Sequence, residues 1–359
     1  MHLAHLRLRD FRNYARLDSD FVPGFHVLMG DNAQGKTNIL EAIYLMATLR
    51  SFRGAGGALM VRQGQKGYFV GGQAISTGQA DIRIYWSATE RKLTLNSQPV
   101  RRLADYLGTV RAVVFCSEDL LLVKGTGRIR RRFIDLLLSQ SNPHYITLLH
   151  RYTQALKSRN ALLKQKLLDE TALESFSREL ADAGDQIRAL RETLVPDFSP
   201  LAAANYSRIA GPSEPLQLAY APSVKTDMTT ELARFRTRER AFRSTLVGPH
   251  RDDLQILIHG RPAAQFASEG QKRSIAIAMK MAQAEFLTKL HGAPPILLID
   301  DVMGELDLKR RTGLMPLLER SQQSRGQVFM TCTEESWPAE IGRELHRWKV
   351  QSGQLQGRS

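Results

Sequence analysis

The chain has 359 residues, a length that predicts two or three structural units with a sizeable buried core. Lys and Arg number 50 against 36 Asp and Glu, a formal charge of +14, and 43% of the residues are hydrophobic. This composition excludes a largely disordered chain, and no stretch reaches the ~18 apolar residues of a membrane helix. Arg7, Arg9 and Arg12 interrupt any signal-peptide core, and Cys116 and Cys332 match no metal or disulfide spacing. We expect a soluble cytoplasmic protein whose charge either serves solubility alone or attracts a polyanion.

The first region of the chain predicts short strands around a glycine-rich loop. Residues 2–9 alternate weakly between apolar and polar side chains and predict an edge strand. Phe21–Met29 predicts a buried strand, and Asn38–Arg50 predicts a helix. The sequence between them is Gly30-Asp31-Asn32-Ala33-Gln34-Gly35-Lys36-Thr37.

This G-x-x-x-x-G-K-T pattern between a strand and a helix is typical of a phosphate-binding loop. Gly30 and Gly35 allow the backbone to curl so that its N–H groups point at phosphate oxygens. Lys36 would place a cation against the β and γ phosphates, and Thr37 would supply a hydroxyl group to Mg²⁺. Further strands are predicted at Phe69–Trp86, Lys92–Leu95 and Ala112–Phe115. We therefore expect residues 1–118 to form one α/β lobe.

Residues 119–242 predict a helical domain. Asn142-Pro143 is a typical helix start, and the helix it opens could run to Leu168. Thr171–Glu174 reads as a capping box for a second helix, which must end before Pro196 and lie antiparallel to the first. Ser199-Pro200 would start a third helix, closed by Gly211.

Two arginine clusters lie in this helical region. The first cluster consists of Arg128, Arg130, Arg131 and Arg132, and the second of Arg234, Arg236, Arg238, Arg240 and Arg243. A charged run is usually a solvated helix face. Because the whole chain is basic, we expect at least one cluster to contact phosphates.

Residues 243–359 predict a second α/β lobe with two polar motifs. Leu254–Ile258 reads as a strand, and the turn before it, residues 246–253, contains His250, Arg251, Asp252 and Asp253. That group could form a metal or acid–base site, but a structural or nucleotide-sensing turn is the favoured interpretation. Ser268 is suited to cap a helix, and Gly270 permits close approach of a backbone, so this helix start is a candidate anion site together with Gln271.

The apolar strand Ile296–Ile299 ends in two carboxylates, a Walker B pattern. Asp300 would reach the Mg²⁺ shell, and Asp301 stands where a water-activating base belongs. Glu305-Leu306-Asp307 follows, and Val328–Met330 predicts a further strand.

In this order the motifs resemble the ABC-type ATPases of the chromosome-maintenance group and, within that group, the RecF family. The resemblance rests on residues 8–14, 30–37, 115–120, 122–125, 130–135, 245–254 and 268–273, and it extends along essentially the whole chain. It implies a P-loop ATPase head, a mixed sheet with flanking helices, into which a helical second domain is inserted. Residues 30–37 with Arg12, Asn13, Ser268, Gly270 and Gln271 would then contact the nucleotide.

The same resemblance implies an activity and partners. It implies binding of single-stranded, gapped or junction DNA, an ATP-dependent homodimer, and slow DNA-stimulated ATP hydrolysis that acts as a switch. RecO and RecR would be partners in loading RecA, and the SOS response would be supported. Two residues depart from the pattern: Gly304 stands where the family usually has Ser, and Asp301 stands where ABC transporters have Glu.

Two other functions fit parts of the sequence. The ATP-binding subunit of a transporter would need a membrane partner and a second glycine before Gln271, where this chain has Glu269-Gly270. A P-loop kinase for a small molecule would leave Ser268–Gln271 and the positive charge without a role. A longer structural-maintenance ATPase is disfavoured, because only about 120 residues separate the two lobes.

Overall fold

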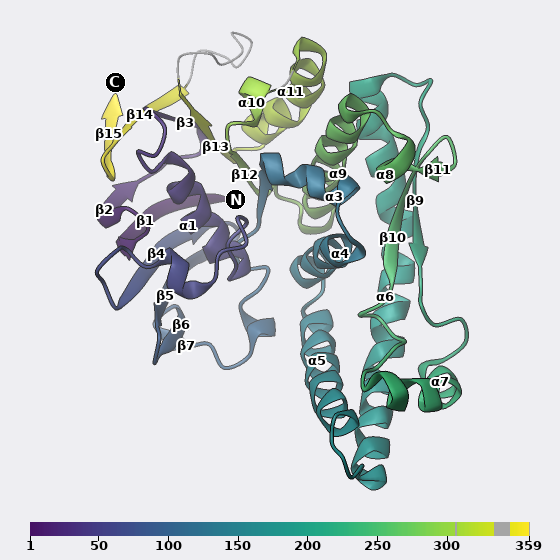
Figure 1. Ribbon diagram of the computed structural model, residues 1–359. Coiled ribbons are helices and arrows are strands. Elements are labelled where there is room, and N and C mark those ends of the chain that lie inside the picture. Colours follow the sequence, from purple (N-terminus) through teal and green to yellow (C-terminus); the bar gives the residue numbers. More distant parts are fainter. Residues whose placement is uncertain (306, 334–344, 359) are drawn as a thin grey trace.

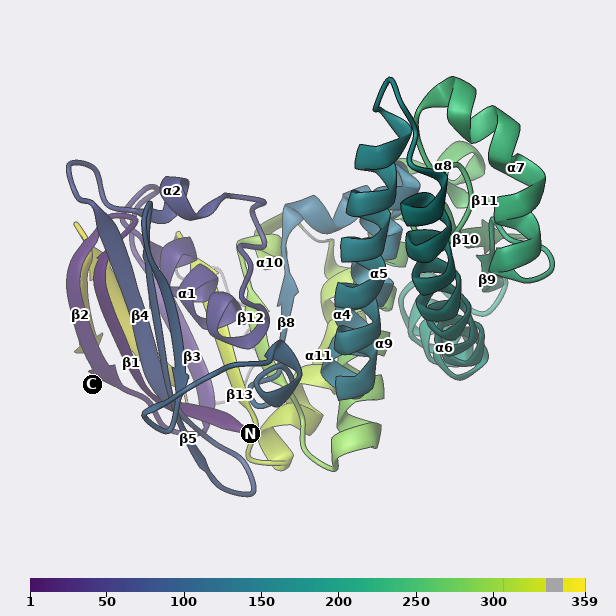
Figure 2. The same cartoon turned by 90° about the horizontal axis from the view of Figure 1, so that it is seen from below.

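The computed structural model describes residues 1–305, 307–333 and 345–358. Within these residues the strands form three sheets. The two larger sheets and the helices beside them build a head, from which the helices α5, α6 and α7 project as an arm (Figure 1, Figure 2).

The central sheet of the head has the strand order β15-β14-β3-β13-β12-β8 and is parallel except for β15. Its strands are β3 (Gly24–Met29), β8 (Ala112–Phe115), β12 (Ile296–Ile299), β13 (Gln327–Cys332), β14 (Leu345–Gln351) and β15 (Gln354–Arg358). The predicted strands at 112–115, 296–299 and 328–330 are confirmed. β8, β12 and β13 are buried along their whole length, as expected for strands covered on both faces.

Alternate residues of these strands belong to two different hydrophobic cores. Leu298 packs in the core that contains the apolar face of α1 (Lys36–Thr48), whereas Leu297 and Ile299 pack in the core that contains α9 (Glu269–His291). This period of two places α1 and α9 on opposite faces of the sheet. The phosphate-binding loop after β3 and the Asp300–Asp301 pair after β12 therefore start from strands of the same sheet.

The second sheet is antiparallel, with the order β2-β1-β4-β5-β6-β7. Its strands are β1 (His2–Phe11), β2 (Tyr14–Asp20), β4 (Gly67–Ile75), β5 (Gln79–Ser87), β6 (Arg91–Leu95) and β7 (Gln98–Pro99). The predicted edge position of residues 2–9 is wrong, because β1 pairs with β2 on one side and β4 on the other. Alternation reveals that Leu6 and Leu8 face the core, but it carries no information on how many neighbours a strand has.

The arm begins after α4 (Gly127–Ser141) as an antiparallel pair of helices, α5 (Pro143–Leu163) and α6 (Glu170–Ala210) (Figure 1). The predicted helix start is confirmed, since the Asn142 side chain accepts a hydrogen bond from the His144 N–H at 3.0 Å. α5 ends five residues before the predicted Leu168. The cap of α6 is Asp169 and not Thr171, because the Asp169 carboxylate accepts from the Ala172 N–H at 2.9 Å.

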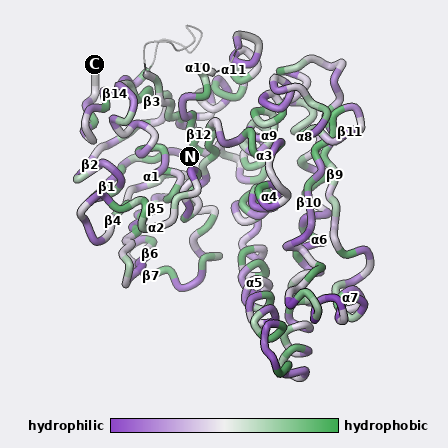
Figure 3. Tube along the Cα trace, in the orientation of Figure 1, coloured by the Kyte–Doolittle hydropathy of each residue, from purple (hydrophilic) through white to green (hydrophobic). Residues whose placement is uncertain are grey.

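The predicted break of this region into two helices is also wrong. α6 runs without interruption through Pro196 and Pro200. Its apolar face keeps its helical spacing across both prolines, with Leu194, Phe198 and Ala202 buried in the core shared with α9. Burial of such side chains contributes about 1.5–3 kcal/mol each and offsets the roughly 3 kcal/mol cost of an internal proline. Figure 3 shows hydrophobic and hydrophilic residues alternating along α5 and α6.

A third sheet, β11-β10-β9, ties the arm to the last part of the chain. β9 (Leu216–Ala221) lies inside the range predicted to be helical, and it pairs with β10 (Asp253–Ile258), which precedes β11 (Arg261–Pro262). The predicted strand 254–258 is confirmed. α7 (Met228–Phe242) follows β9 at the side of the arm (Figure 2).

Shorter helices connect these elements: α2 (Gly57–Met60), α3 (Leu121–Lys124), α8 (Ala263–Phe266), α10 (Val302–Glu305), α11 (Leu308–Gln323), and the 3-10 helices η1 (Leu103–Asp105) and η2 (Ser117–Leu120). In the described part of the chain, every helix is too short or too polar to span a bilayer.

Candidate functional site

The predicted phosphate-binding loop connects β3 to α1 in a conformation that requires its glycines. Gly30 and Gly35 have φ values of +152° and +116°. A methyl group on Gly30 would lie 2.2 Å from the Val350 carbonyl oxygen, so glycine is needed there for space as well. No side chain among the described residues caps the start of α1 at Gly35. The first N–H groups of this helix are therefore placed to bind an anion.

Lys36 crosses the inside of the loop. Its buried side chain donates from Nζ to the carbonyl oxygens of Gly30 at 2.6 Å and Asp31 at 2.9 Å. Asn32 and Ala33 are exposed at the tip of the loop. The ammonium group thus lies within the curl of backbone that would surround a phosphate.

Two segments far apart in the sequence brace the loop from outside. Asn13, in the turn between β1 and β2, donates from Nδ2 to the Gln34 carbonyl oxygen at 2.8 Å. In the turn between β14 and β15, the Ser352 N–H donates to Gln34 Oε1 at 2.6 Å, and the Gly353 N–H donates to the Gln34 carbonyl at 3.2 Å. Sequence reasoning named Asn13 but missed the turn at 352–353.

Arg12 lies beside the loop but is committed to a buried carboxylate. Its Nε and Nη2 donate to the two oxygens of Glu41 on α1, both at 2.7 Å, and its Nη1 donates to the Leu59 carbonyl at 2.7 Å. Glu41 is fully buried and also accepts from the Ser51 hydroxyl at 2.5 Å. This contact fixes Arg12 at the β1–β2 turn, next to Asn13.

The carboxyl end of β12 brings Asp300 to the phosphate-binding loop. Thr37 Oγ1 donates to Asp300 Oδ1 at 2.7 Å, although 263 residues separate the two in sequence. Thr331, at the end of the neighbouring β13, donates from Oγ1 to the same oxygen at 3.0 Å. Burial raises the pKa of Asp300, the two hydroxyl hydrogen bonds oppose that rise, and nearby Asp301 adds to it.

This group of oxygens suits a hard cation. The Thr37 hydroxyl and the Asp300 carboxylate are the ligand types that Mg²⁺ prefers, usually one or two protein oxygens together with phosphate and water. Consistent with such a sparse set, the described residues contain no cluster of three or more His, Cys, Asp or Glu side chains that could hold a metal.

Asp301, the residue after Asp300, has a φ of +53°, and its N–H donates to Thr331 Oγ1 at 2.9 Å.

The second candidate anion site is the start of α9. Ser268 caps the helix as predicted: the Gln271 N–H donates to Ser268 Oγ at 3.2 Å, and the Ser268 N–H donates to Gln271 Oε1 at 2.7 Å. A methyl group on Gly270 would lie 2.6 Å from Arg310 Nη2. α8, which ends at Phe266 just before this helix start, and β3, which ends at the loop, lie on different sides of the molecule in both views (Figure 1, Figure 2). The structure of one chain does not bring Ser268, Gly270 and Gln271 to the loop.

The first arginine cluster is divided between structural and exposed side chains. Arg130 donates to both oxygens of Asp253, at 2.8 and 2.7 Å, and Arg131 donates to the Asp252 carbonyl at 2.6 Å. Arg128 and Arg132 are exposed, and no carboxylate of the described chain lies within ion-pair distance of either guanidinium.

A cationic cavity opens at this point. A cavity of about 480 Å³ lies between α1, α4 and α5, and a second one of about 550 Å³ lies beside β5 and β6. Both have Arg50 and Arg132 in their walls, and the first also has Arg128 and Arg131. Asp135 is the acid in the first wall, but it already binds Arg191 at 2.8 Å. The first cavity is therefore a positively charged cleft between head and arm, and the second lies in the head and shares Arg50 and Arg132 with it.

The second cluster, on α7, is partly paired: three of its five arginines lie near two carboxylates. Arg236 and Arg240 both pair with Glu170, and Arg234 lies 3.6 Å from Glu231. Arg238 stacks over Phe235 with 5.5 Å between its guanidinium carbon and the ring centroid. Arg243 ends the helix in the left-handed conformation. These contacts support the ordinary interpretation of this cluster as a solvated helix face.

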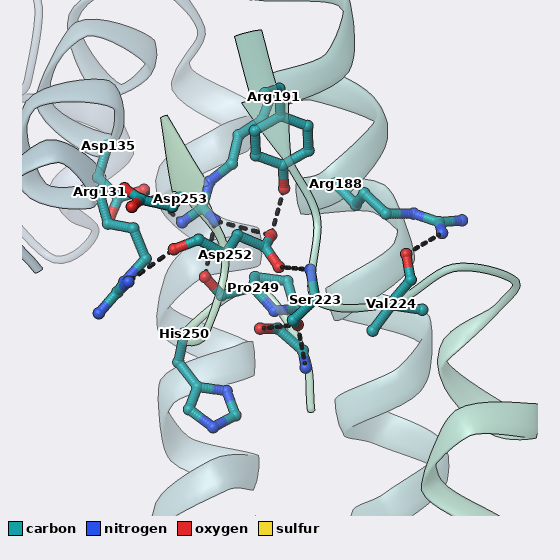
Figure 4. A network of polar contacts seen from close by, with 12 residues as sticks. Arg131, Asp135, Arg188, Arg191, Ser223, Val224, Pro249, His250, Asp252 and Asp253 are labelled. Carbon is teal, nitrogen blue, oxygen red and sulfur yellow. Dashed lines mark hydrogen bonds and ion pairs between the residues drawn. The ribbon is translucent and has the colours of Figure 1, made fainter. Parts of the chain in front are cut away.

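The turn before β10 is a buried structural junction (Figure 4). Asp252 accepts from Arg191 at 3.2 Å, from the Ser223 N–H at 2.7 Å and from the Tyr220 hydroxyl. His250 contacts the Tyr152 hydroxyl at 2.6 Å, and burial lowers its pKa to about 4. These bonds join α5, α6, β9 and β10. The structure thus supports the structural interpretation of residues 246–253.

Besides the turn at 352–353, sequence reasoning missed Thr331. The sequence shows a hydroxyl residue near the end of β13, the strand that pairs in parallel with the Walker B strand β12. It does not show that these two strands are neighbours, so Thr331 could not be placed beside Asp300. The predicted motif Glu305-Leu306-Asp307, with the departure at Gly304, lies partly outside the described residues.

Comparisons with known proteins match the chain over nearly its full length. The family described as RecF/RecN/SMC N terminal domain matches residues 2–354. DNA replication and repair protein RecF of Symbiobacterium thermophilum is 38% identical over 360 residues, 95% of each chain, and RecF of Cyanothece sp. is 38% identical over 93% of this chain and 92% of its own.

Solved structures agree with this relationship. The recombination mediator protein RecF, in a structure of RecF-ATPrS in the RecFOR pathway, is similar with a TM-score of 0.89 and 29% identity, covering 100% of this chain and 98% of its own. An Smc head domain from Pyrococcus furiosus, bound to the C-terminal domain of ScpA, shares the fold alone, with a TM-score of 0.57 and 17% identity over 99% and 96% of the two chains. The predicted fold of an ABC-type ATPase head with a helical insertion is confirmed. The chain belongs to the RecF family of DNA replication and repair proteins.

Proposed function

We propose that this protein is an ATP-gated switch that binds DNA during repair and replication. The observation that carries the proposal is the hydrogen bond between Thr37 and Asp300, which joins the phosphate-binding loop to the Walker B strand. Family membership and the solved RecF-ATP structure in the RecFOR pathway support ATP as the nucleotide. They disfavour the transporter subunit and the small-molecule kinase.

The chemistry proposed for the site divides between a few side chains. Mg²⁺, when bound, would neutralise charge on the β- and γ-phosphate oxygens, and Thr37 and Asp300 are the residues that would hold it. Lys36 would bind those same phosphates. Asp301 would orient the attacking water and accept its proton. Because aspartate is shorter than the usual glutamate, its reach is less favourable, which supports slow hydrolysis. Stimulation of this hydrolysis by DNA is part of the same proposal.

The active form is proposed to be a dimer. Ser268, Gly270 and Gln271 of one subunit would cap the nucleotide held by Lys36 and Asp300 of the other, so that two nucleotides lie across a two-fold interface. The separation of α9's start from the loop within one chain supports this arrangement. ATP would then hold the dimer together, and hydrolysis would release it.

The proposed DNA contact is the cleft lined by Arg50, Arg128, Arg131 and Arg132. Single-stranded, gapped or junction DNA would lie there, and RecO and RecR would act with the protein in loading RecA and in the SOS response, in the cytoplasm. Residues 1–118 and 243–359 would form one head, which the pairing of β3 with β13 and β14 supports, and residues 119–242 would form the arm.

Sedimentation with a non-hydrolysable ATP analogue tests the shared site. Lys36→Ala should bind no nucleotide and stay monomeric. Ser268→Arg should bind the analogue as a monomer, because the change lies outside the loop that holds the phosphates, and it should not hydrolyse ATP. A Ser268→Arg protein that dimerises normally would refute the shared site, and a Lys36→Ala protein that still hydrolyses ATP would refute the assignment of the loop.

A further inference from the structure

The outer face of the antiparallel sheet carries a row of cationic and aromatic side chains that the proposed ATP and DNA sites do not use. Strand pairing places Arg16 of β2 opposite Arg9 of β1, Arg9 opposite Phe69 of β4, Phe69 opposite Tyr85 of β5, and Tyr85 opposite Lys92 of β6. The five residues therefore form one line across five strands. At the usual strand spacing the row is ~19 Å long.

The row faces away from the core. Leu8 and Leu17, which flank the two arginines in sequence, are buried with α1, whereas Arg9 and Arg16 are exposed. Tyr85 is 36% exposed. In Figure 2 the sheet stands at one margin of the molecule, with α1 on one of its two sides.

Both aromatic rings lie along the sheet, close to glycines. A methyl group on Gly71 would lie 2.7 Å from Phe69 Cζ, and one on Gly67 would lie 3.2 Å from the Tyr85 hydroxyl oxygen. Glycine at both positions leaves the room that the rings occupy. Phe69 is half-buried and Tyr85 is exposed, so a strand that reaches this face of the sheet meets both rings, and aromatic rings are side chains on which unpaired bases stack.

The two arginines are arranged at a cost to folding. Like charges directly opposite one another on neighbouring strands repel and destabilise a sheet. In the described chain no carboxylate lies within ion-pair distance of Arg9 or Arg16. The other cations nearby are compensated: Arg7 by Asp18 at 3.7 Å, Arg83 by Asp81 at 2.8 Å, and Lys92, at the end of the row, by Glu90 at 2.7 Å. A polyanion bound along the row would relieve this repulsion.

We propose that this row, Arg16–Arg9–Phe69–Tyr85–Lys92, is a platform for single-stranded DNA. Phosphates of the strand would lie against Arg9 and Arg16, and one or two unpaired bases would stack on Phe69 and Tyr85. Duplex DNA is a poorer fit, because its bases are covered by their own neighbours and expose no face to a flat ring. The inference rests on the proposal that the protein binds DNA, and it names the form of DNA that the head itself recognises.

The test compares three labelled probes with the intact chain by fluorescence anisotropy: oligo-dT, an abasic oligonucleotide of the same length, and a duplex. Tyr85→Ala and Phe69→Leu should each weaken binding of oligo-dT by roughly fivefold or more. The same variants should bind the abasic strand and the duplex as the unaltered chain does, because neither probe offers a free base. Equal loss on all three probes, or no loss on oligo-dT, would overturn the platform.

The arginines have an independent test whose two readouts move in opposite directions. Arg16→Gln should weaken binding of both oligo-dT and the abasic strand severalfold at low salt, while thermal stability stays the same or rises because the repulsion is removed. The matched control is Arg178→Gln, an exposed arginine of the arm that removes the same charge. If Arg16 serves only the fold, Arg16→Gln should lower the thermal stability and bind both single-stranded probes as tightly as Arg178→Gln does.

The two proposals fail in different ways. If the unaltered chain binds neither oligo-dT nor duplex, the proposed DNA-binding function itself is refuted. If it binds DNA but the platform variants match it, only the platform is refuted. Competition by polyglutamate that Arg16→Gln abolishes, while Phe69→Leu and Tyr85→Ala leave the binding of oligo-dT unchanged, would assign the row to an acidic protein instead.

Discussion

Among single residues, Asp300 combines a cost to folding with a role in the proposed chemistry. Its pKa is raised because burial disfavours the charged form more than the Thr37 and Thr331 hydroxyls stabilise it. A carboxyl whose folded pKa lies above its unfolded value of ~3.9 holds its proton better in the folded state. Stability therefore falls as the pH rises from that unfolded value through the folded pKa, and the cost is fully present above the folded pKa.

Replacement of Asp300 should separate stability from activity. Asp300→Asn removes the buried charge, so we expect Tm at neutral pH to rise by roughly 2 °C, about what 1 kcal/mol produces in a domain of this size. ATP hydrolysis should be lost, because the proposed Mg²⁺ ligand is gone. Thermal melts and phosphate release measure the two effects, with exposed Asp197→Asn as the control. A Tm that falls in Asp300→Asn would show that the carboxylate supports the fold.

Among the elements, α6 is the one whose sequence conflicts most with its structure. Pro196 has no N–H to donate, and its ring opposes the carbonyl of the preceding turn, so it weakens the helix it occupies. We expect Pro196→Ala to stabilise the protein by up to ~3 kcal/mol, measured as a shift in the urea midpoint without change in slope. An unchanged or lower midpoint would mean that the chain needs the proline where α6 packs on the head.

How well an element could be predicted depended on whether its signal is local. β8 and β12 are four-residue apolar runs, one opening after Arg111 and the other lying between Pro295 and Asp300, and both were predicted to the residue. β9 was missed although Leu216 and Leu218 alternate with polar or small residues, because long helices on both sides obscured a short strand. α6 was divided because local proline rules apply to an isolated helix, whereas packing against α9 decides the outcome in the protein.

The candidate site follows the same rule. The phosphate-binding loop, the Ser268 cap and the Asp300–Asp301 pair are contiguous motifs, and each is where the sequence places it. Thr331 and the turn at 352–353 join the site only because β13 and β14 flank β3, an order that no local pattern encodes.

At the scale of the whole molecule, the charge of +14 makes DNA affinity sensitive to salt. Three phosphate contacts, at Arg50, Arg128 and Arg132, would give a slope of about −2.7 in a plot of log affinity against log salt for a duplex. We expect Arg128→Gln to reduce that slope by about 0.9. Arg236→Gln should leave it unchanged, because the Arg236 guanidinium already pairs with Glu170 at 2.7 Å. Titrations at several salt concentrations measure both. Equal effects of the two variants would contradict the choice of cleft.

The placement of β3 between β13 and β14 has a consequence for how the protein is made. Residues 30–37 leave the ribosome early, but the neighbours of β3 and the turn that holds Gln34 are synthesised last. At about 5–20 residues per second, the ~300 intervening residues take roughly 15–60 s. For most of that time the nascent chain has the loop and Asn13, but neither Asp300 nor the turn at 352–353 beside it. We therefore expect nucleotide loading, and with it pairing of two copies, to wait until translation is complete.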